Sequence, residues 1–191
     1  MTDGRRACGV QLENGREIAA DIVVSNADPG WTYEQLLRQH TKKRWTKKKL
    51  DISKWSMGLF VWYFGTKGTS NEWTDVGHHT ILNGPRYRGL LKDIFDRRFL
   101  ADDMSLYLHR PSVSDPSVAP EGDDCFYALS PVPNLKTKNA VDWNNEAVKY
   151  KEKMRNVLEK VMPGFSQKIE AEHVLTPNDF QSRYLSTFGA G

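Results

Sequence analysis

The spacing of apolar residues predicts a β-hairpin near the start of the chain. Apolar and polar residues alternate over residues 8–12, and Asn14-Gly15 follows. Both turn residues tolerate positive φ, which makes this dipeptide a strong signal for a tight hairpin turn. The return strand over residues 18–24 ends in Ile22-Val23-Val24, which is apolar on both faces, as in a strand that enters a covered sheet. The pattern therefore predicts a surface ribbon that leads into a buried sheet.

Strand and helix patterns alternate along the rest of the chain. Asp28-Pro29 starts a helix over residues 31–40, because Asp caps a helix and Pro fits its first turn. Further strands are predicted over residues 56–64, 80–82, 104–109, 125–129 and 169–175, and helices over residues 86–99, 146–162 and from 176 onward. This order predicts a fold of the α/β (α+β) type, in which a mixed or antiparallel sheet carries helices on one side.

The strand over residues 56–64 is the most apolar segment of the chain. Alternation puts one set of apolar side chains on one face and a second set on the other. The sets are Phe60, Trp62 and Phe64, and Leu59, Val61 and Tyr63. Such a strand is either buried on both faces, or packs on helices with one face and lines an apolar cavity with the other. The pattern alone leaves both interpretations open.

Composition narrows the classes of function. The chain has 191 residues, 39% of them hydrophobic, and a net charge of only +3, so it is no obvious binder of polyanions. Cys8 and Cys125 have no paired spacing, which argues against a disulfide framework or a zinc motif and fits a reducing, cytosolic setting. No apolar run is long enough to span a bilayer. No Gly-x-Ser-x-Gly motif supports hydrolase chemistry.

Residues 42–49 form the densest local cluster of positive charge. Six basic side chains surround Trp45, namely Lys42, Lys43, Arg44, Lys47, Lys48 and Lys49. The cluster is either a solvated charged face, a contact with anionic lipid head groups with Trp at the interface, or a nucleic-acid site with an aromatic ring between the charges. Nucleic acid is the least favoured partner, because no nucleic-acid motif accompanies the cluster and the net charge is small.

Side chains suited to catalysis or metal binding are scattered. The five histidines include one adjacent pair, His78-His79, but neighbours on a strand point to opposite faces. Neither a Cys/His motif nor a helical His-x-x-x-His occurs, so no metal site is predicted. The acidic pairs Asp102-Asp103 and Asp123-Asp124 lie in predicted loops, where turn and cap chemistry explains them.

Two stretches around the ribbon, residues 9–15 (GVQLENG) and 20–28 (ADIVVSNAD), resemble flavoproteins of the amine-oxidase-like superfamily. In those proteins such a ribbon returns the chain to the FAD domain before it crosses into the substrate domain. Later motifs sharpen the resemblance to the bacterial-type phytoene desaturases. They lie at residues 56–65, 78–80, 84–88, 105–112, 115–122, 131–135, 162–164 and 176–180. The ordered set covers essentially the whole chain and is far more specific than any one motif.

The resemblance implies part of a two-domain, FAD-dependent oxidoreductase of carotenoid biosynthesis. FAD accepts a hydride from a saturated carbon pair of a long polyene, in an enzyme that is cytoplasmic and peripheral to an anionic membrane surface. Residues 1–28 are then assigned to the FAD domain, residues 29–180 to the substrate-binding and membrane-associating domain, and residues 181–191 to the start of the return to the FAD domain.

The resemblance also suggests roles for individual residues. Near the cofactor it implies Ser25, Asn26 and Ala27. In an apolar substrate tunnel it implies Phe60, Trp62, Phe64 and Tyr107. It favours membrane contact for the basic cluster at residues 42–49. No catalytic residue is carried over, because those proposed for such enzymes fall largely outside this stretch.

The chain departs from the family pattern in one respect. No Gly-x-Gly-x-x-Gly opens a helix after a strand, so the pyrophosphate cradle is absent from this stretch. The closing FAD segment is expected beyond residue 191. We therefore expect this chain alone to be inactive and not to hold FAD.

Rival functions stay open at this level. One is another FAD-dependent oxidoreductase, such as a diapophytoene desaturase or a retinol saturase-like enzyme. The other is a non-catalytic lipid- or partner-binding module that reuses the fold. The sequence does not reveal the number of desaturation steps, the double-bond geometry, the terminal electron acceptor, or whether the protein is a homo-oligomer.

Overall fold

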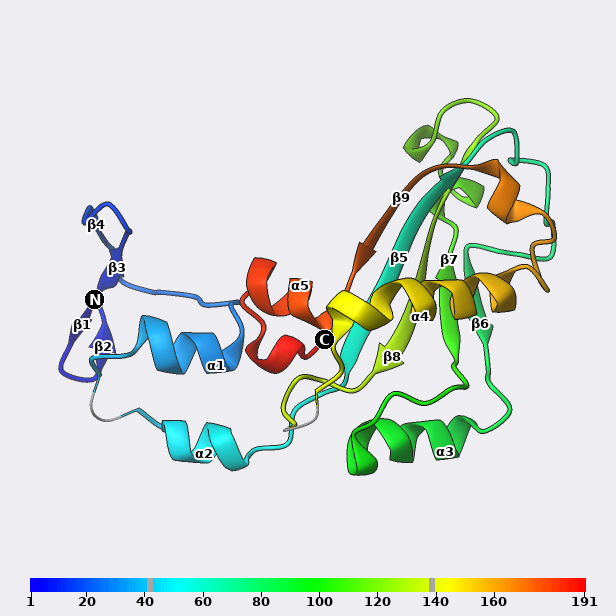
Figure 1. Ribbon diagram of the computed structural model, residues 1–191. Coiled ribbons are helices and arrows are strands. Elements are labelled where there is room, and N and C mark those ends of the chain that lie inside the picture. Colours follow the sequence, from blue (N-terminus) through cyan, green and yellow to red (C-terminus); the bar gives the residue numbers. More distant parts are fainter. Residues whose placement is uncertain (41–42, 138–139) are drawn as a thin grey trace. The chain divides into compact units, whose positions relative to one another are not determined.

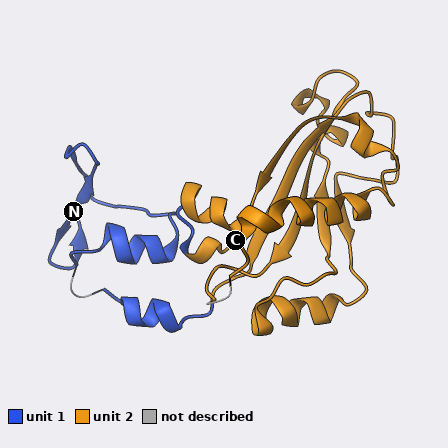
Figure 2. Cartoon of the chain, in the orientation of Figure 1, with its two compact units in different colours: residues 1–54, 185–187 blue, residues 55–184, 188–191 orange. Residues whose placement is uncertain are grey.

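The computed structural model describes residues 1–40, 43–137 and 140–191 (Figure 1). The chain divides into two compact units (Figure 2). Unit 1 comprises residues 1–54 and 185–187, and unit 2 comprises residues 55–184 and 188–191. The compact units thus divide after Lys54, whereas the assignment of residues 1–28 and 181–191 to a nucleotide-binding domain stays a prediction.

Unit 1 begins with two short antiparallel strand pairs. The first joins β1 (Thr2–Asp3) to β2 (Arg6–Ala7), and the second joins β3 (Gly9–Gln11) to β4 (Glu17–Ala19). Val10 lies opposite Ile18, and Gly15 has a φ of +82° in the connecting turn. The predicted hairpin with its Asn14-Gly15 turn is therefore confirmed.

The prediction that residues 18–24 form one long strand is wrong. β4 ends at Ala19, and no strand follows it before α1. Ile22 is 81% exposed and Val24 is 87% exposed. The physical reason is that no strand among the described residues pairs with this segment, so its backbone has no ladder to join.

Two short helices complete unit 1. The Asp28 side chain accepts a hydrogen bond from the backbone N–H of Trp31 at 3.0 Å, which caps α1 (Pro29–Trp31) as predicted. The helix widens into a π-helical turn over Thr32–Leu36 and ends before the predicted residue 40. α2 (Lys47–Ile52) begins after Thr46, whose hydroxyl accepts from the backbone N–H of Lys49 at 3.4 Å.

Unit 2 is built on a five-stranded, fully antiparallel sheet. Its strands are β5 (Gly58–Thr66), β6 (His79–Leu82), β7 (Leu106–His109), β8 (Asp124–Val132) and β9 (Ile169–Leu175), in the order β6-β7-β8-β5-β9. The five predicted strands are all present, and β8 is longer than predicted. The mixed helix and sheet architecture of the prediction is confirmed.

Helices connect the strands of unit 2. α3 (Tyr87–Lys92) continues into a π-helical turn over Asp93–Arg97, and α4 (Trp143–Leu158) and α5 (Pro177–Arg183) follow β8 and β9. Thr176 and Asp179 form a reciprocal capping box at the start of α5, in agreement with the sequence pattern. The loop between β7 and β8 contains two 3₁₀ turns, Pro111–Val113 and Pro116–Val118.

The core of unit 2 lies between α4 and one face of the sheet (Figure 1). Phe60 on β5 contacts Trp143 and Tyr150 on α4, with ring centroids 5.5 and 5.0 Å apart. Trp62 and Phe64 lie on the same face of β5 and pack against Phe165. Helix α4 therefore covers one face only, and the opposite face of the sheet carries the site described next.

Candidate functional site on the open face of the sheet

One row of aromatic and histidine side chains crosses all five strands on the face away from α4. The strand register aligns one residue per strand, in the order His79, His109, Tyr127, Tyr63 and His173. Residues that pair across antiparallel strands project from the same face, so these five side chains share the open face. A second row, which includes Tyr107 and Val61, runs beside the first.

The rings from His79 through His109 and Tyr127 to Tyr63 touch one another. Tyr127 lies between its neighbours, with its ring centroid 4.6 Å from that of His109 and 5.7 Å from that of Tyr63. The ring of Tyr107 also lies 5.8 Å from Tyr127. These contacts join the rings into a continuous aromatic surface, whose polar atoms are the imidazole nitrogens and the tyrosine hydroxyls.

A cavity of about 510 Å³ lies over this surface. It is lined by Tyr63, Tyr127, Ala171, His109 and His173 among others. Cavities of this size and apolar character suit small or elongated apolar ligands, and the few polar groups at their edges orient the ligand.

The environment shifts the pKa values of several groups in this region. Burial raises the pKa of the Tyr63 hydroxyl, and burial together with a hydrogen bond to Tyr107 raises that of Tyr127, so both phenols stay neutral. Burial, followed by the neighbouring charges of His78 and His79, lowers the pKa of His109. At Tyr63, Tyr127 and His109, burial thus shifts each pKa toward the neutral form, which suits an apolar ligand.

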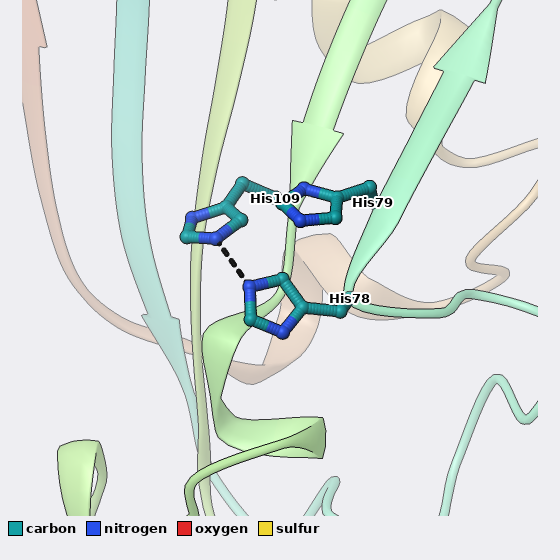
Figure 3. Close-up of side chains that lie close together, drawn as sticks. All are labelled: His78, His79 and His109. Carbon is teal, nitrogen blue, oxygen red and sulfur yellow. Dashed lines mark hydrogen bonds between the residues drawn. The ribbon is translucent and has the colours of Figure 1, made fainter.

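Three histidines gather at the β6 and β7 edge of the open face (Figure 3). His78 Nε2 lies 2.7 Å from His109 Nε2, and the rings of His79 and His109 stack with centroids 5.2 Å apart. The expectation that His78 and His79 point to opposite faces is wrong. β6 begins at His79, so the strand alternation does not extend to His78.

A buried ion pair fixes the far end of β7 and the start of β8. Arg110 donates from Nε to Asp124 Oδ1 at 3.1 Å and from Nη2 to Oδ2 at 2.8 Å. Arg110 also donates to the backbone carbonyls of Thr69, Glu72 and Trp73. The pair therefore ties the loop after β5 to the two central strands. The prediction of simple turn chemistry for Asp124 missed this role.

The predicted substrate-binding residues divide between the two faces. Tyr107 lies on the open face beside Tyr127. Phe60 and Trp62 are 0% exposed and Phe64 is buried in the core under α4, although Phe64 also borders the cavity. A role of Phe60, Trp62 and Phe64 in substrate binding stays a prediction. The open face of β5 belongs to the other alternating set, through Tyr63.

The predicted cofactor-binding residues lie in an exposed segment of unit 1. The hydroxyls of Ser25 and Thr32 are hydrogen-bonded at 3.0 Å, and the backbone carbonyl of Ala27 accepts from the Thr32 hydroxyl at 3.4 Å. Asn26 lies between them and is exposed. These hydrogen bonds fix the backbone just before α1. A role of these residues near a cofactor stays a prediction.

The basic cluster lies at the start of α2, except for Lys42, which falls outside the described residues. Trp45 is partly exposed, and Lys48 is exposed on the first turn of the helix. Lys43 donates to the backbone carbonyl of Tyr33 at 2.7 Å.

Some charges in the cluster have partners. Lys47 forms an ion pair with Asp51 at 2.9 Å, and Lys49 donates to the backbone carbonyl of Arg44 at 3.1 Å. The segment keeps an excess of positive charge beside an exposed indole ring.

Known proteins resemble this chain over nearly its whole length. It is 58% identical over 190 residues to a neurosporene-forming phytoene desaturase of Rhodobacter capsulatus, a match that covers 99% of the chain. The chain is one segment of the phytoene desaturase family. It is also 40% identical to a lycopene-forming phytoene desaturase of Pantoea ananas and 35% identical to a 4,4'-diapophytoene desaturase of Staphylococcus haemolyticus. No family model matches the chain.

The chain is shorter than these relatives. It spans 36% of the Rhodobacter capsulatus protein and 38% of the Pantoea ananas protein. A solved structure of an oxidoreductase from Methanosarcina mazei matches 92% of the segment and 35% of its own chain, with a TM-score of 0.58 and 16% identity. At that identity the likeness shows the fold alone. Among the described residues, no helix combines the length and the apolar character that crossing a bilayer demands.

Proposed function

We propose that this chain is the substrate-facing part of an FAD-dependent carotenoid desaturase, and that the open face of its sheet binds a long polyene. The relatives named above support the reaction class. The observation that carries the proposal is the aromatic row, with the cavity of about 510 Å³ above it. A hydrocarbon offers no hydrogen-bonding groups, so it is held by burial against rings such as those of Tyr63 and Tyr127.

In the reaction, the protein positions the substrate and excludes water from it. Bound FAD, held mainly by other parts of the full-length protein, would supply the redox chemistry. The tyrosine rings would orient the chain of the polyene and exclude water from it.

The residues present do not make a phosphate cradle for FAD. The Asp28 carboxylate caps α1 and accepts from Trp31, and α1 spans only Pro29–Trp31. No glycine fingerprint occurs in the chain to bring backbone N–H groups to a pyrophosphate. The cofactor would therefore be held mainly by parts of the full-length protein outside this segment, with residues 25–27 as a minor contact.

Phytoene is favoured over a shorter diapophytoene substrate. Identity is 58% to the phytoene desaturase of Rhodobacter capsulatus and 35% to the diapophytoene desaturase of Staphylococcus haemolyticus. A retinol saturase-like enzyme and a non-catalytic lipid-binding module are the remaining alternatives. Homo-oligomer formation stays a prediction.

We also propose that the basic cluster docks the full-length protein on anionic membranes, as a peripheral protein on the cytoplasmic side. The polyene is too apolar to cross water, so its entrance has to meet the bilayer. Exposed lysines attract anionic head groups, and an indole ring such as that of Trp45 favours the membrane–water interface.

The experiment that tests the proposed reaction uses the purified full-length protein with phytoene in detergent or liposomes. Without oxygen, the proposal predicts that bound flavin is bleached as the absorbance of a more conjugated polyene appears. Chromatography then identifies the products. Bound flavin without any new polyene would favour a different superfamily oxidoreductase, and a protein that holds no flavin would favour the lipid-binding module.

A further inference from the structure

We propose that His78, His79 and His109 form a binding site for one divalent transition-metal ion, with zinc as the reference ion. The site lies at one end of the aromatic row and shares His109 with the lining of the cavity, but its zinc affinity is measured without substrate or turnover. The first observation is proximity, because one ring nitrogen from each histidine lies within 4.8 Å of the others. The rings come from three backbone positions around the edge of the sheet and gather in one place (Figure 3).

The fold sets this convergence. His79 on β6 and His109 on β7 are paired residues, so their side chains share the open face. His78 precedes β6, and its backbone carbonyl accepts from the N–H of Arg110 at 2.9 Å. That bond holds the start of β6 beside the end of β7. From there His78 Nε2 reaches to 2.7 Å from His109 Nε2.

Groups behind the rings orient two of the three histidines. His78 Nδ1 lies 2.6 Å from the Ser114 hydroxyl, and His79 Nδ1 lies 2.5 Å from the Tyr107 hydroxyl. A metal-binding histidine ordinarily uses its second ring nitrogen for a hydrogen bond of this kind, which fixes the tautomer and the ring orientation. When each Nδ1 donates to its hydroxyl partner, the Nε2 atoms of His78 and His79 each keep a lone pair for a metal.

The ligand set defines the ion. Three imidazole ligands without a carboxylate favour zinc, copper, nickel or iron over calcium or magnesium, which prefer oxygen ligands. Three protein ligands leave a fourth tetrahedral position for water or an added ligand. With metal–nitrogen bonds of about 2.1 Å, ligating nitrogens lie about 3.4 Å apart. The His78 and His109 pair would open slightly, and the exposed His79 ring would move closer to them.

The competing arrangement needs no metal. His78 and His109 share a hydrogen bond, and the third ring stacks on His109. A metal site binds one metal ion per chain tightly, whereas the hydrogen-bonded arrangement alone does not. A metal titration therefore distinguishes the two.

The test uses the tag-free full-length protein, stripped with a chelator and titrated with Zn²⁺ against a chromogenic competitor. We expect one zinc per chain, and at least a tenfold loss of affinity in His109→Ala and in His79→Ala. Tyr107→Phe, which removes only the hydroxyl behind His79, should weaken binding roughly tenfold. His173→Ala is the matched control, because His173 lies in the same cross-strand row but outside the cluster, and its affinity should be unchanged.

Circular dichroism checks the fold of every variant, and the exposed His79→Ala serves if His109→Ala does not fold. In a parallel measurement, Cu²⁺ bound to the unaltered protein should give an electron paramagnetic resonance spectrum with nitrogen hyperfine splitting. The proposal is overturned if stoichiometric zinc binding is missing, or if His79→Ala and His109→Ala bind zinc as tightly as His173→Ala.

Discussion

Arg110 and Asp124 show how much a single pair of residues contributes to this fold. Their side chains are 3% and 2% exposed and meet through two hydrogen bonds. The hydroxyls of Ser112 and Thr69 also donate to Asp124, at 2.6 and 2.8 Å. A buried charge that loses its partner is costly, whereas the complete pair is tolerated because every charge is matched.

We predict that Arg110→Met or Asp124→Asn lowers the free energy of unfolding by about 3–5 kcal/mol, because each leaves a buried partner uncompensated. Chemical denaturation of the full-length protein measures the loss. The matched control is Arg6→Met, since Arg6 and Asp21 form an exposed ion pair at 3.3 Å of the kind that contributes about 0–1 kcal/mol. Equal losses in the buried and exposed variants would contradict the assignment.

The same pair predicts a dependence of stability on pH. Burial alone would raise the pKa of Asp124, but the bonds from Arg110, Ser112 and Thr69 outweigh it and lower the pKa below the ordinary 3.8. A carboxyl whose folded-state pKa is depressed stabilises the fold above its unfolded pKa, and this stability is lost as pH falls through the folded pKa. Asp124→Asn should flatten the pH dependence below about pH 4. An unchanged acid transition would refute this source of pH dependence.

For single residues, the sequence predicted the interaction partners of the side chains poorly. Asp123-Asp124 and His78-His79 were interpretable only as local pairs, because their partners Arg110 and His109 are distant in the sequence or set by strand register. The start of β6 at His79 decides where His78 points, and a one-residue shift of that boundary cannot be predicted from alternation. Local capping by Asp28 and Thr176 was predictable, because each cap and its partners lie within three residues.

At the level of a single element, the two faces of strand β5 have different roles. Phe60 packs on α4 in the core, whereas Tyr63 is 39% exposed on the open face. Alternation correctly separated these two sets of side chains. It did not reveal which set faces α4, since both sets are apolar and that choice depends on the packing of distant elements.

We predict opposite outcomes for substitutions on the two faces of β5. Phe60→Ala should lower the free energy of unfolding by about 3–5 kcal/mol, because it leaves a cavity beside Trp143 and Tyr150. Tyr63→Ala should leave stability within about 1 kcal/mol and reduce polyene turnover. Denaturation midpoints and product chromatography on the full-length protein separate the two effects. If Phe60→Ala is stable and Tyr63→Ala turns over substrate normally, the assignment of one face to the core and the other to the substrate is wrong.

The segment around α2 gives a second prediction for an element. Changing Lys47, Lys48 and Lys49 to Gln should weaken binding of the full-length protein to anionic vesicles by up to about 3 kcal/mol, since each basic residue near the surface contributes about 1 kcal/mol. Liposome co-sedimentation measures it, and salt should weaken binding, because charges are screened over about 8 Å at physiological ionic strength.

A charge-matched control for this test changes Lys149, Lys153 and Lys160 on and after α4 to Gln. Activity on detergent-solubilised substrate should be intact in both variants. If the two triple variants lose vesicle binding equally, only net charge matters, and the basic cluster is a solvated face.

At the scale of the whole molecule, the exposed apolar residues of unit 1 require a partner. Ile22 and Val24 are almost fully exposed, and no strand among the described residues pairs with their segment. Patches of this kind mark surfaces that are covered in a larger assembly. The relatives are long enough to supply such a cover, because this chain spans only 36% of the Rhodobacter capsulatus protein.

We predict that a protein limited to residues 1–191 binds a hydrophobic dye strongly, self-associates and does not retain FAD in a one-to-one ratio. The full-length protein should bind less dye and carry flavin. Fluorescence, size-exclusion chromatography and the flavin absorbance per chain measure these properties. A monodisperse monomer of residues 1–191 with one flavin per chain would contradict two claims. These are that the apolar residues of unit 1 need a cover and that FAD is held mainly outside this segment.

The central claim is that the open face of the sheet, and not the face under α4, binds the polyene. The most direct measurement is polyene turnover by the full-length Ala171→Trp variant, because Ala171 lines the cavity and a tryptophan there would fill it. Val148→Trp, on the exposed side of α4, adds the same side chain outside the cavity. The account predicts at least a tenfold loss of turnover for Ala171→Trp alone, with flavin content and unfolding midpoint unchanged. Normal turnover by a folded, flavin-loaded Ala171→Trp variant would contradict it.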